Sequence, residues 1–344
     1  MILVLNCGSQ SIKWKLFDKN LKLKEEGKRE VPNSKDFQKI LTKELNQLKE
    51  SYSGKIKRIG HRVVHGGEKF RRPTKITKRV LRELDKFKKL APLHNPFNIL
   101  GIKISERVFP GILQFAVFDT EFFADLPQKV FTYPLPEKIR KNYGFRKFGF
   151  HGISHEYVAK EGSQRIKKPF GKLKIITCHL GGGASISAIK YGKAIDTSMG
   201  FTPLEGLVMM TRSGDIDPGI VLDLAKKFSV KRADKILNFQ SGVKGISGIK
   251  SMLEVLKRVK RGDKRAKLAL EIFVYRIQKY LGAYFVILGG CDLLVFTGAI
   301  GAGSQKIRNM VYNNLNFLKK IKILAIETNE ELAIARKIKT LKKA

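Results

Sequence analysis

Two arginines stand among residues that could bind an anion. Arg62 is followed by Val63 and Val64, and a partly buried guanidinium needs an anionic partner. Arg212 lies in a segment of glycines and small polar residues, 196–219, with little helical or strand periodicity. Segments of this kind are more often functional sites than core elements. We therefore expect an anion beside Arg62 and a functional site around Arg212.

An aspartate and a histidine extend this set of candidate residues. Asp119 closes an apolar run, and a carboxylate at the carboxyl end of a strand points into the ligand crevice of an open α/β sheet. A cap of a helix or turn is the alternative role for Asp119. His151 stands beside an aromatic residue between glycines, a loop composition with little packing rationale. His61 and His65, by contrast, are better explained as hydrogen-bonded structural histidines.

Three loops rich in glycine or serine follow short apolar runs. In 175–189 an apolar run enters the turn Gly181–Gly183 and an alternating run leaves it, which predicts a strand, a tight loop and a strand. Successive glycines let backbone N–H groups approach an anion closely. The stretch 2–18 repeats this plan, and 293–303 has a strand followed by a glycine loop. The repetition predicts a duplicated α/β architecture with a nucleotide in a central cleft between the halves.

Helices are expected around these loops. The apolar spacing predicts a helix over 34–49 and a long helix over 265–284. Thr328 and Glu331 fit a capping box at the start of a C-terminal helix. Acidic residues near a helix start are favourable in themselves, so Glu330 has a structural explanation as well as a functional one.

Composition favours a globular protein with two domains. The 344 residues are 43% hydrophobic and 9% aromatic, and the formal charge is 68 minus 30, or +38. Lysines are spread through nearly every segment, so we prefer a general composition bias to a nucleic-acid partner. Three distant cysteines without metal-ligand spacing predict a reducing interior. The first six residues lack a basic n-region and are too short for a signal peptide, so we expect none. The stretch 284–303 fits a helix end and a buried strand better than a membrane span. We expect a cytoplasmic protein with no membrane partner.

The chain resembles the acetate kinases, which belong to the superfamily of actin, Hsp70 and the sugar kinases. The resemblance runs from Leu3 to nearly the last residue. It implies a two-domain, ribonuclease H-like fold, in which 1–123 plus 332–344 form an N-terminal lobe with the first phosphate loop and 124–331 form a C-terminal lobe with the second phosphate loop and the nucleotide site. The motifs that carry it are 61–68, 91–96, 148–152 and 197–206.

The resemblance implies reversible in-line transfer of a phosphoryl group between ATP and acetate, with Mg²⁺ as cofactor, in a homodimer. Arg62 and Arg212 would clamp the carboxylate and the migrating phosphoryl group, and His151 would stabilise the transition state. Asp119 would orient an arginine or act in acid/base and magnesium contacts. By the same resemblance, Mg²⁺ would be held by Asn6 and Glu330. The first phosphate loop would contain Ser9, Ser11 and Lys13, and the second would contain His179, Leu180, Gly181, Gly182 and Gly183, with Gly301 also at the nucleotide. The methyl group would be held by Val64, Leu93, Phe150 and Pro203.

Several positions depart from the pattern of the family, mostly at the nucleoside end. The acetate kinases usually have Asn at the position of Gly182, and the triple glycine of this chain is closer to the related butyrate kinases. These changes predict altered nucleotide selectivity before any loss of chemistry. The other departures are Met252–Glu254 in place of an Asp-Phe-Arg contact to adenosine, Gly301–Gly303 without the Glu-Asn that usually follows, Gln10 in place of Ser, Phe123 in place of His, and a shortened segment between Leu315 and Ile326.

Three alternatives stay open. Propionate or butyrate could replace acetate, since an apolar pocket discriminates by only about 1–3 kcal/mol per methylene. A catalytically weak basic protein on the same scaffold would bind nucleic acid with a steep salt dependence and form no acyl phosphate. A sugar kinase would need a pocket that recognises hydroxyl groups in place of the four apolar residues named above.

Overall fold

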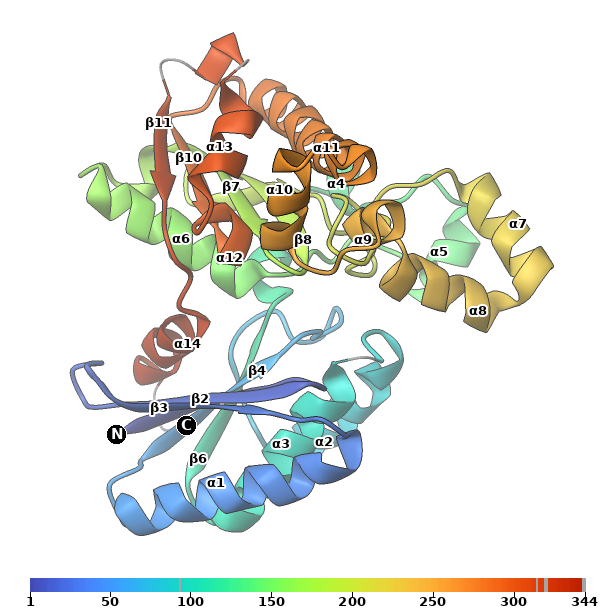
Figure 1. Ribbon diagram of the computed structural model, residues 1–344. Coiled ribbons are helices and arrows are strands. Elements are labelled where there is room, and N and C mark those ends of the chain that lie inside the picture. Colours follow the sequence, from blue (N-terminus) through green and yellow to red (C-terminus); the bar gives the residue numbers. More distant parts are fainter. Residues whose placement is uncertain (93, 314, 319–320, 342–344) are drawn as a thin grey trace. The chain divides into compact units, whose positions relative to one another are not determined.

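The computed structural model describes residues 1–92, 94–313, 315–318 and 321–341, which form two compact units (Figure 1). Unit 1 contains Met1–Ala124, Gly152–Ser154 and the chain from Asn329 onward, and unit 2 contains Asp125–His151 and His155–Thr328. The lobes expected from the sequence differ from this division at residue 124, at 152–154 and at 329–331. Leu93, expected in the methyl pocket, and residues 342–344 lie outside the described residues.

Unit 1 is built on a six-stranded sheet of order β3-β2-β1-β4-β6-β5. The central strand β1 (Ile2–Cys7) runs antiparallel to β2 (Ser11–Phe17) and parallel to β4 (Arg58–Val63), which is parallel to β6 (Leu113–Phe118). β3 (Leu23–Glu30) and β5 (Thr74–Lys75) are the edges. Because β1 is covered on both faces, it is apolar without alternation.

Helices cover both faces of this sheet (Figure 1). On one face, α1 (Phe37–Ser51) and α3 (Asn95–Val108) pack against each other and share a core with Leu3 and Leu5. On the other, α14 (Glu330–Lys339) lies so close to β4 that a Cβ on Gly60 would stand 2.6 Å from Ile334 Cγ2. The remaining short elements of unit 1 are α2 (Lys78–Lys86) and the 3-10 helices η1 (Ser34–Asp36), η2 (Phe87–Lys89) and η3 (Glu121–Phe123).

Unit 2 is built on a five-stranded sheet of order β11-β10-β7-β8-β9. β7 (Lys174–Leu180) and β8 (Ala184–Lys190) form a hairpin, and β10 (Leu293–Thr297) runs parallel to β7. The long helix α11 (Lys264–Leu288) packs on β7 and β8. The other elements are β9 (Lys193–Thr197), β11 (Lys322–Ala325), α4 (Gln128–Phe131), α5 (Glu137–Tyr143), α6 (Gly152–Arg165, whose first three residues belong to unit 1), α7 (Pro218–Phe228), α8 (Val230–Lys235), the π-helix η5 (Ile236–Gln240), α9 (Gly242–Ser247), α10 (Met252–Lys260), α12 (Gly298–Gly301), α13 (Gln305–Tyr312) and the 3-10 helices η4 (Phe170–Lys172) and η6 (Asn316–Leu318).

The two sheets repeat one topology, which confirms the predicted duplicated α/β fold. In each, a central strand pairs with the next strand of a hairpin on one side and with a later parallel strand on the other: β3-β2-β1-β4-β6 in unit 1 corresponds to β9-β8-β7-β10-β11 in unit 2. The glycine- and serine-rich loops predicted after the first strands of the two hairpins follow β1 and β7, whereas the glycine loop predicted after 293–297 is wrong at its start, because the helix α12 directly follows β10. Within the described part of the chain, no helix combines the length and the apolar character that crossing a membrane requires.

The predicted helices at 34–49 and 265–284 are confirmed as η1 with α1 and as α11. The predicted capping box at Thr328 is wrong. The N-cap of α14 is Asn329, whose side chain accepts a hydrogen bond from the N–H of Leu332 at 3.1 Å. Glu331 instead accepts a hydrogen bond from Asn6 Nδ2, which places the start of α14 at the carboxyl end of β1.

Candidate active site

In unit 1 an arginine and two carboxylates meet at the carboxyl ends of neighbouring strands. Arg62 lies near the end of β4, and Asp119 directly follows β6, its parallel neighbour. Arg62 Nε and Nη2 donate to the two oxygens of Asp119 at 3.0 and 2.7 Å, and Nη1 lies 2.9 Å from Glu330 Oε2. Arg62 is therefore bound on both sides by carboxylates of its own unit.

Electrostatics in this cluster follow from burial and from an excess of carboxylates. Burial alone would lower the pKa of Arg62, but Asp119 and Glu330 raise that pKa above its ordinary value. The pKa of Glu330 is raised to about 7, mainly by burial and further by Asp119 and Glu331, against the pull of Arg62. The positive charge of Arg62 is thus balanced within the cluster.

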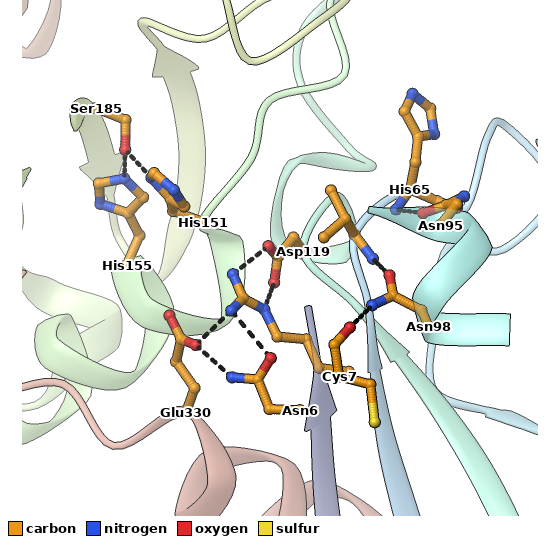
Figure 2. A network of polar contacts seen from close by, with 12 residues as sticks. Asn6, Cys7, His65, Asn95, Asn98, Asp119, His151, His155, Ser185 and Glu330 are labelled. Carbon is orange, nitrogen blue, oxygen red and sulfur yellow. Dashed lines mark hydrogen bonds and ion pairs between the residues drawn. The ribbon is translucent and has the colours of Figure 1, made fainter. Parts of the chain in front are cut away.

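Asn6 at the end of β1 joins the same cluster (Figure 2). Its Nδ2 donates to Glu331 Oε1 at 3.2 Å and to Glu330 Oε2 at 3.5 Å, and its Oδ1 accepts from Arg62 Nη1 at 3.4 Å. Among the described residues, no group of three or more His, Cys, Asp or Glu side chains is placed to hold a metal ion. The oxygens of Asn6 and Glu330 nevertheless fit Mg²⁺, which is commonly held by one or two carboxylates while waters and substrate phosphates complete its coordination.

The first loop of unit 1 and the segment after β4 flank this cluster in the sequence. Gly8 N donates to Ser11 O at 2.9 Å and closes the loop that carries Ser9, while Lys13 pairs with Asn6 in the β1–β2 register. Val64 is buried, and its N–H donates to Asn98 Oδ1 at 3.0 Å. His61 contacts Gln114 Oε1 at 2.7 Å and is buried, which confirms its structural role.

In unit 2 the side chain of His151 lies in a second polar cluster. His151 is the N-cap of α6, and its φ of 59° is unusual for a residue with a side chain. A left-handed residue costs about 1–3 kcal/mol and such residues gather at functional sites. Its Nδ1 lies 2.9 Å from Ser185 Oγ on β8 (Figure 2). Its ring stacks on that of His179 with 4.3 Å between the ring centroids.

Arg212 lies beside His151 and the glycine loop. A Cβ built on Gly183 would stand 3.2 Å from His151 Cε1 and 3.6 Å from Arg212 Nη1. Met210 N donates to Gly182 O at 3.2 Å and ties the loop to the Arg212 segment. Among the described residues Arg212 has no carboxylate in ion-pair range; Nη1 contacts only Pro203 O at 3.5 Å and Met209 Sδ at 3.7 Å. Burial lowers its pKa.

Two carboxylates of unit 2 hold the segment around Arg212 in place. Glu205 is bound by Tyr133 and lies 2.8 Å from Lys147 Nζ. Asp215 accepts from Gly206 N and from Tyr280 Oη, both at 2.7 Å. These contacts cannot be identified from the sequence, because tyrosines distant in the chain supply part of them.

The structure therefore divides the expected site residues between the units. Phe150 is buried next to His151, and Leu180 ends β7. A Cβ on Gly301 would stand 3.4 Å from Leu180 Cβ, so the helix α12 lies against β7. Unit 1 holds Asn6, Ser9, Ser11, Lys13, Arg62, Val64, Asp119 and Glu330; unit 2 holds Phe150, His151, His179, Leu180, Gly181, Gly182, Gly183, Pro203, Arg212 and Gly301.

Three residues around His151 went unrecognised in the sequence. His155 contacts Ser185 Oγ through Nε2 at 2.8 Å and Thr177 Oγ1 through Nδ1 at 2.7 Å. The available signals were the four-residue spacing of His151 and His155 on a helix and the two-residue spacing of Thr177 and His179 on a strand. Either spacing alone is common, and only the fold joins them.

A duplicated α/β fold of this topology, with glycine loops after corresponding strands and a histidine and an arginine beside one of them, defines a phosphotransferase of the actin-like kinase class. The family model of the acetokinase family matches residues 21–320. The chain belongs to the acetokinase family.

Individual relatives agree along nearly the whole chain. The acetate kinase of Halothermothrix orenii is 42% identical over 391 aligned positions, which cover 97% of this chain and 98% of that one. The crystal structure of Porphyromonas gingivalis acetate kinase is 36% identical, covers 99% of each chain and has a TM-score of 0.90. A propionate kinase from Francisella tularensis is also 36% identical, covers 98% of each chain and has a TM-score of 0.89.

Proposed function

We propose that the protein catalyses reversible, ATP-dependent phosphorylation of acetate to acetyl phosphate by in-line phosphoryl transfer. The observation that carries this proposal is Arg212, a guanidinium without a carboxylate partner among the described residues, beside His151 and the tip of a glycine loop. Such a group needs an anion. Family membership and relatives named as acetate kinases support phosphoryl transfer as the use of that anion.

In unit 2, Arg212 and His151 contact the transferring phosphoryl group. Phosphoryl transfer requires little covalent work from a protein, so positioning and charge stabilisation supply most of the rate. The N–H groups of Gly181, Gly182 and Gly183 bind the phosphates of ATP. His179, Leu180 and Gly301 border the same nucleotide, and Phe150 and Pro203 offer apolar surface to the methyl group of the acid.

In unit 1, Arg62 binds the carboxylate of the acid, and Asp119 holds the guanidinium in a fixed plane through its two hydrogen bonds. Val64 offers apolar surface to the methyl group. Ser9, Ser11 and Lys13 bind a phosphate of the nucleotide. Asn6 and Glu330 would hold Mg²⁺, which would neutralise charge on the phosphates when bound.

A hydroxamate assay with acetate, propionate and butyrate, each with ATP and with a second nucleoside triphosphate, tests the proposal. We expect acyl phosphate from every combination of acid and nucleotide that the protein binds. The highest kcat/KM is expected for acetate with ATP. Absence of acyl phosphate with all three acids contradicts the proposal. Salt-dependent binding to nucleic acid in the same preparation would then support the basic binding protein.

Propionate is the second candidate acid, since one solved relative is named a propionate kinase. One methylene changes discrimination by about 10- to 200-fold in an apolar pocket. A kcat/KM for propionate above that for acetate would therefore reassign the substrate without changing the chemistry.

We further propose that the chain forms a homodimer in the cytoplasm. No residue of α7 is buried, and Ile220, Leu222, Phe228 and Val230 expose large apolar surface on α7 and α8. Exposed apolar patches of this kind mark association sites. The three cysteines Cys7, Cys178 and Cys291 are free, as suits a reducing compartment. Light scattering after size exclusion should give twice the mass of the chain, and a monomeric mass contradicts the dimer.

A further inference from the structure

A chain of hydrogen bonds runs behind His151 in unit 2. It leads from His151 Nδ1 to Ser185 Oγ at 2.9 Å, from Ser185 Oγ to His155 Nε2 at 2.8 Å, and from His155 Nδ1 to Thr177 Oγ1 at 2.7 Å. Thr177, Ser185 and His155 are each 0% exposed. Every contact in this chain has normal hydrogen-bond length.

Local structure explains why these four side chains meet. His151 is the N-cap of α6 and His155 lies in its first turn, where His155 N donates to His151 O at 2.9 Å and keeps the two residues close together. Thr177 and His179 are two residues apart on β7 and share a face of the sheet. Ser185 is the register partner of His179 on β8. The face of the hairpin therefore meets the first turn of the helix.

Counting protons fixes the direction of the hydrogen bonds. Thr177 Oγ1 has no other hydrogen-bond partner among the described residues, so its O–H must donate to His155 Nδ1 or remain buried without an acceptor. A buried donor without an acceptor costs about 1–3 kcal/mol. When Thr177 donates, the proton of a neutral His155 is on Nε2 and is donated to Ser185 Oγ. The single O–H of Ser185 is then donated to His151 Nδ1.

We propose that Thr177, His155 and Ser185 are positioning residues that hold His151 neutral, with its proton on Nε2. His151 then acts on the phosphoryl group as a hydrogen-bond donor and not as a base or a cation. Only this last step rests on the function proposed above. His155 is suited to the neutral form, because burial, assisted by the nearby His179, lowers its pKa well below the ordinary value.

The location of His151 Nε2 agrees with this assignment. A Cβ on Gly183 would stand 3.4 Å from that nitrogen and 3.6 Å from Arg212 Nη1, so Nε2 and the guanidinium face the same glycine. The ring of His151 is also stacked on His179, which restricts its rotation. A second cationic group beside Arg212 would repel it, whereas a neutral N–H donor does not.

The first experiment measures the tautomer directly, without substrate. The full chain is labelled with ¹⁵N in its histidines, of which there are only six, and two-bond ¹H–¹⁵N correlations of the rings are recorded at neutral pH. The spectrum of His151→Asn identifies the signals of residue 151; Asn tolerates the left-handed backbone at this position. We expect protonated Nε2 and unprotonated Nδ1. A proton on Nδ1, or on both nitrogens, overturns the proposal.

The second experiment compares two serines of the same strand. Ser185→Ala removes the hydroxyl that contacts both histidines, whereas the control Ser187→Ala removes a buried hydroxyl that contacts Thr197 Oγ1 at 2.9 Å. We expect Ser185→Ala to lower kcat by about 10- to 100-fold, by analogy with the loss of hydrogen-bond partners that orient metal-ligating groups. KM should change little, and the His151 ring should populate both tautomers. Equal kcat values for the two variants overturn the proposal.

Thr177→Val tests the far end of the chain with a side chain of nearly the same shape. Without the donor at Thr177, the hydrogen bonds between His155, Ser185 and His151 can reverse their direction. Part of the His151 population should then carry its proton on Nδ1, and kcat should fall less than in Ser185→Ala. An unchanged tautomer in folded Thr177→Val contradicts the assigned direction. Since the spectra need no turnover, a protein with the expected tautomer that forms no acyl phosphate refutes the function alone, and normal turnover with the other tautomer refutes the inference alone.

Discussion

Arg62 and Arg212 were predicted as a pair of anion clamps, but their surroundings differ. Arg62 in unit 1 is bound by Asp119 and Glu330, so its guanidinium is held in place and its charge is balanced. Arg212 in unit 2 is also partly buried but has no ion pair among the described residues, and burial lowers its pKa. Under the proposed function, a bound anion would supply the compensation that Arg212 lacks among the described residues, whereas Arg62 already has carboxylate partners within unit 1.

The largest expected effect is on turnover, at Arg212. Arg212→Ala removes the uncompensated positive charge beside the phosphoryl site, so kcat should fall by about 10³-fold or more, as for other arginines that stabilise transferring phosphoryl groups. The hydroxamate assay with acetate and ATP measures this. Arg212→Lys is the control, since it keeps the charge without the planar fork and should retain intermediate activity. Near-normal turnover of the alanine variant refutes the role of Arg212.

The loss of stability should be larger for Arg62→Ala than for Arg212→Ala, the reverse of the order expected for turnover. Arg62→Ala leaves Asp119 and Glu330 buried without their cation, a change that costs about 3–5 kcal/mol. Arg212→Ala breaks no ion pair of the described chain and should cost about 1 kcal/mol. Trp14, the only tryptophan, lies in unit 1, so its fluorescence during urea unfolding reports on the unit that contains Arg62. Equal urea midpoints for the two variants would contradict the larger contribution of Arg62 to stability.

Within unit 2, the neighbouring glycines Gly182 and Gly183 should differ in their sensitivity to substitution. A methyl group added at Gly183 meets His151 and Arg212, whereas one added at the neighbouring Gly182 has no heavy atom within 4 Å. Displacement of a catalytic group by about 1 Å can cost about 10²-fold, so Gly183→Ala should lower kcat by about 10- to 100-fold. Gly182→Ala should lower it less. A larger loss at Gly182 would move the critical contact away from His151.

The smallest effect concerns the pH dependence of stability, through two buried neutral histidines of unit 1. Burial lowers the pKa of His61 to about 4, with the bond to Gln114 opposing, and lowers that of His65 to about 3. Below pH 6.5 the unfolded chain binds protons that the native histidines do not, so stability falls as pH falls. Each group contributes about 1.4 kcal/mol per pH unit between its two pKa values.

Urea unfolding between pH 7 and pH 5 measures this slope. His61→Gln retains a polar group near Gln114 but cannot titrate. Its free energy of unfolding should therefore fall less steeply with falling pH than that of the native chain, by the contribution of one histidine. An identical slope would show that His61 is not held neutral in the native protein.

The sequence predicted the parts of the molecule that depend on local pattern. The hairpins around Asn6–Ser11 and Gly181–Gly183, the strand before Asp119 and the long helix α11 follow from apolar periodicity and glycine chemistry, and they are confirmed. Arg62 and Asp119 were each identified, but their ion pair depends on the adjacency of β4 and β6, which no local pattern states.

Other features depend on partners distant in the chain. Ser185 and Thr177 look like ordinary strand residues until α6 brings His155 against them. The assignment of Thr328 as a cap failed because Asn329, one residue later, offers an equally good acceptor. That Arg212 has no ion pair within the described part of the chain cannot be read from the sequence, since it depends on everything that surrounds the side chain.

The most direct test of the account is ³¹P NMR of the full chain with Mg-ATP and acetate. The proposed function predicts that a resonance of acetyl phosphate grows with that of ADP, and that Arg212→Ala produces neither at a comparable rate. Hydrolysis of ATP to ADP and inorganic phosphate without acetyl phosphate, or equal acetyl phosphate from both proteins, would contradict the central role given to Arg212 and His151.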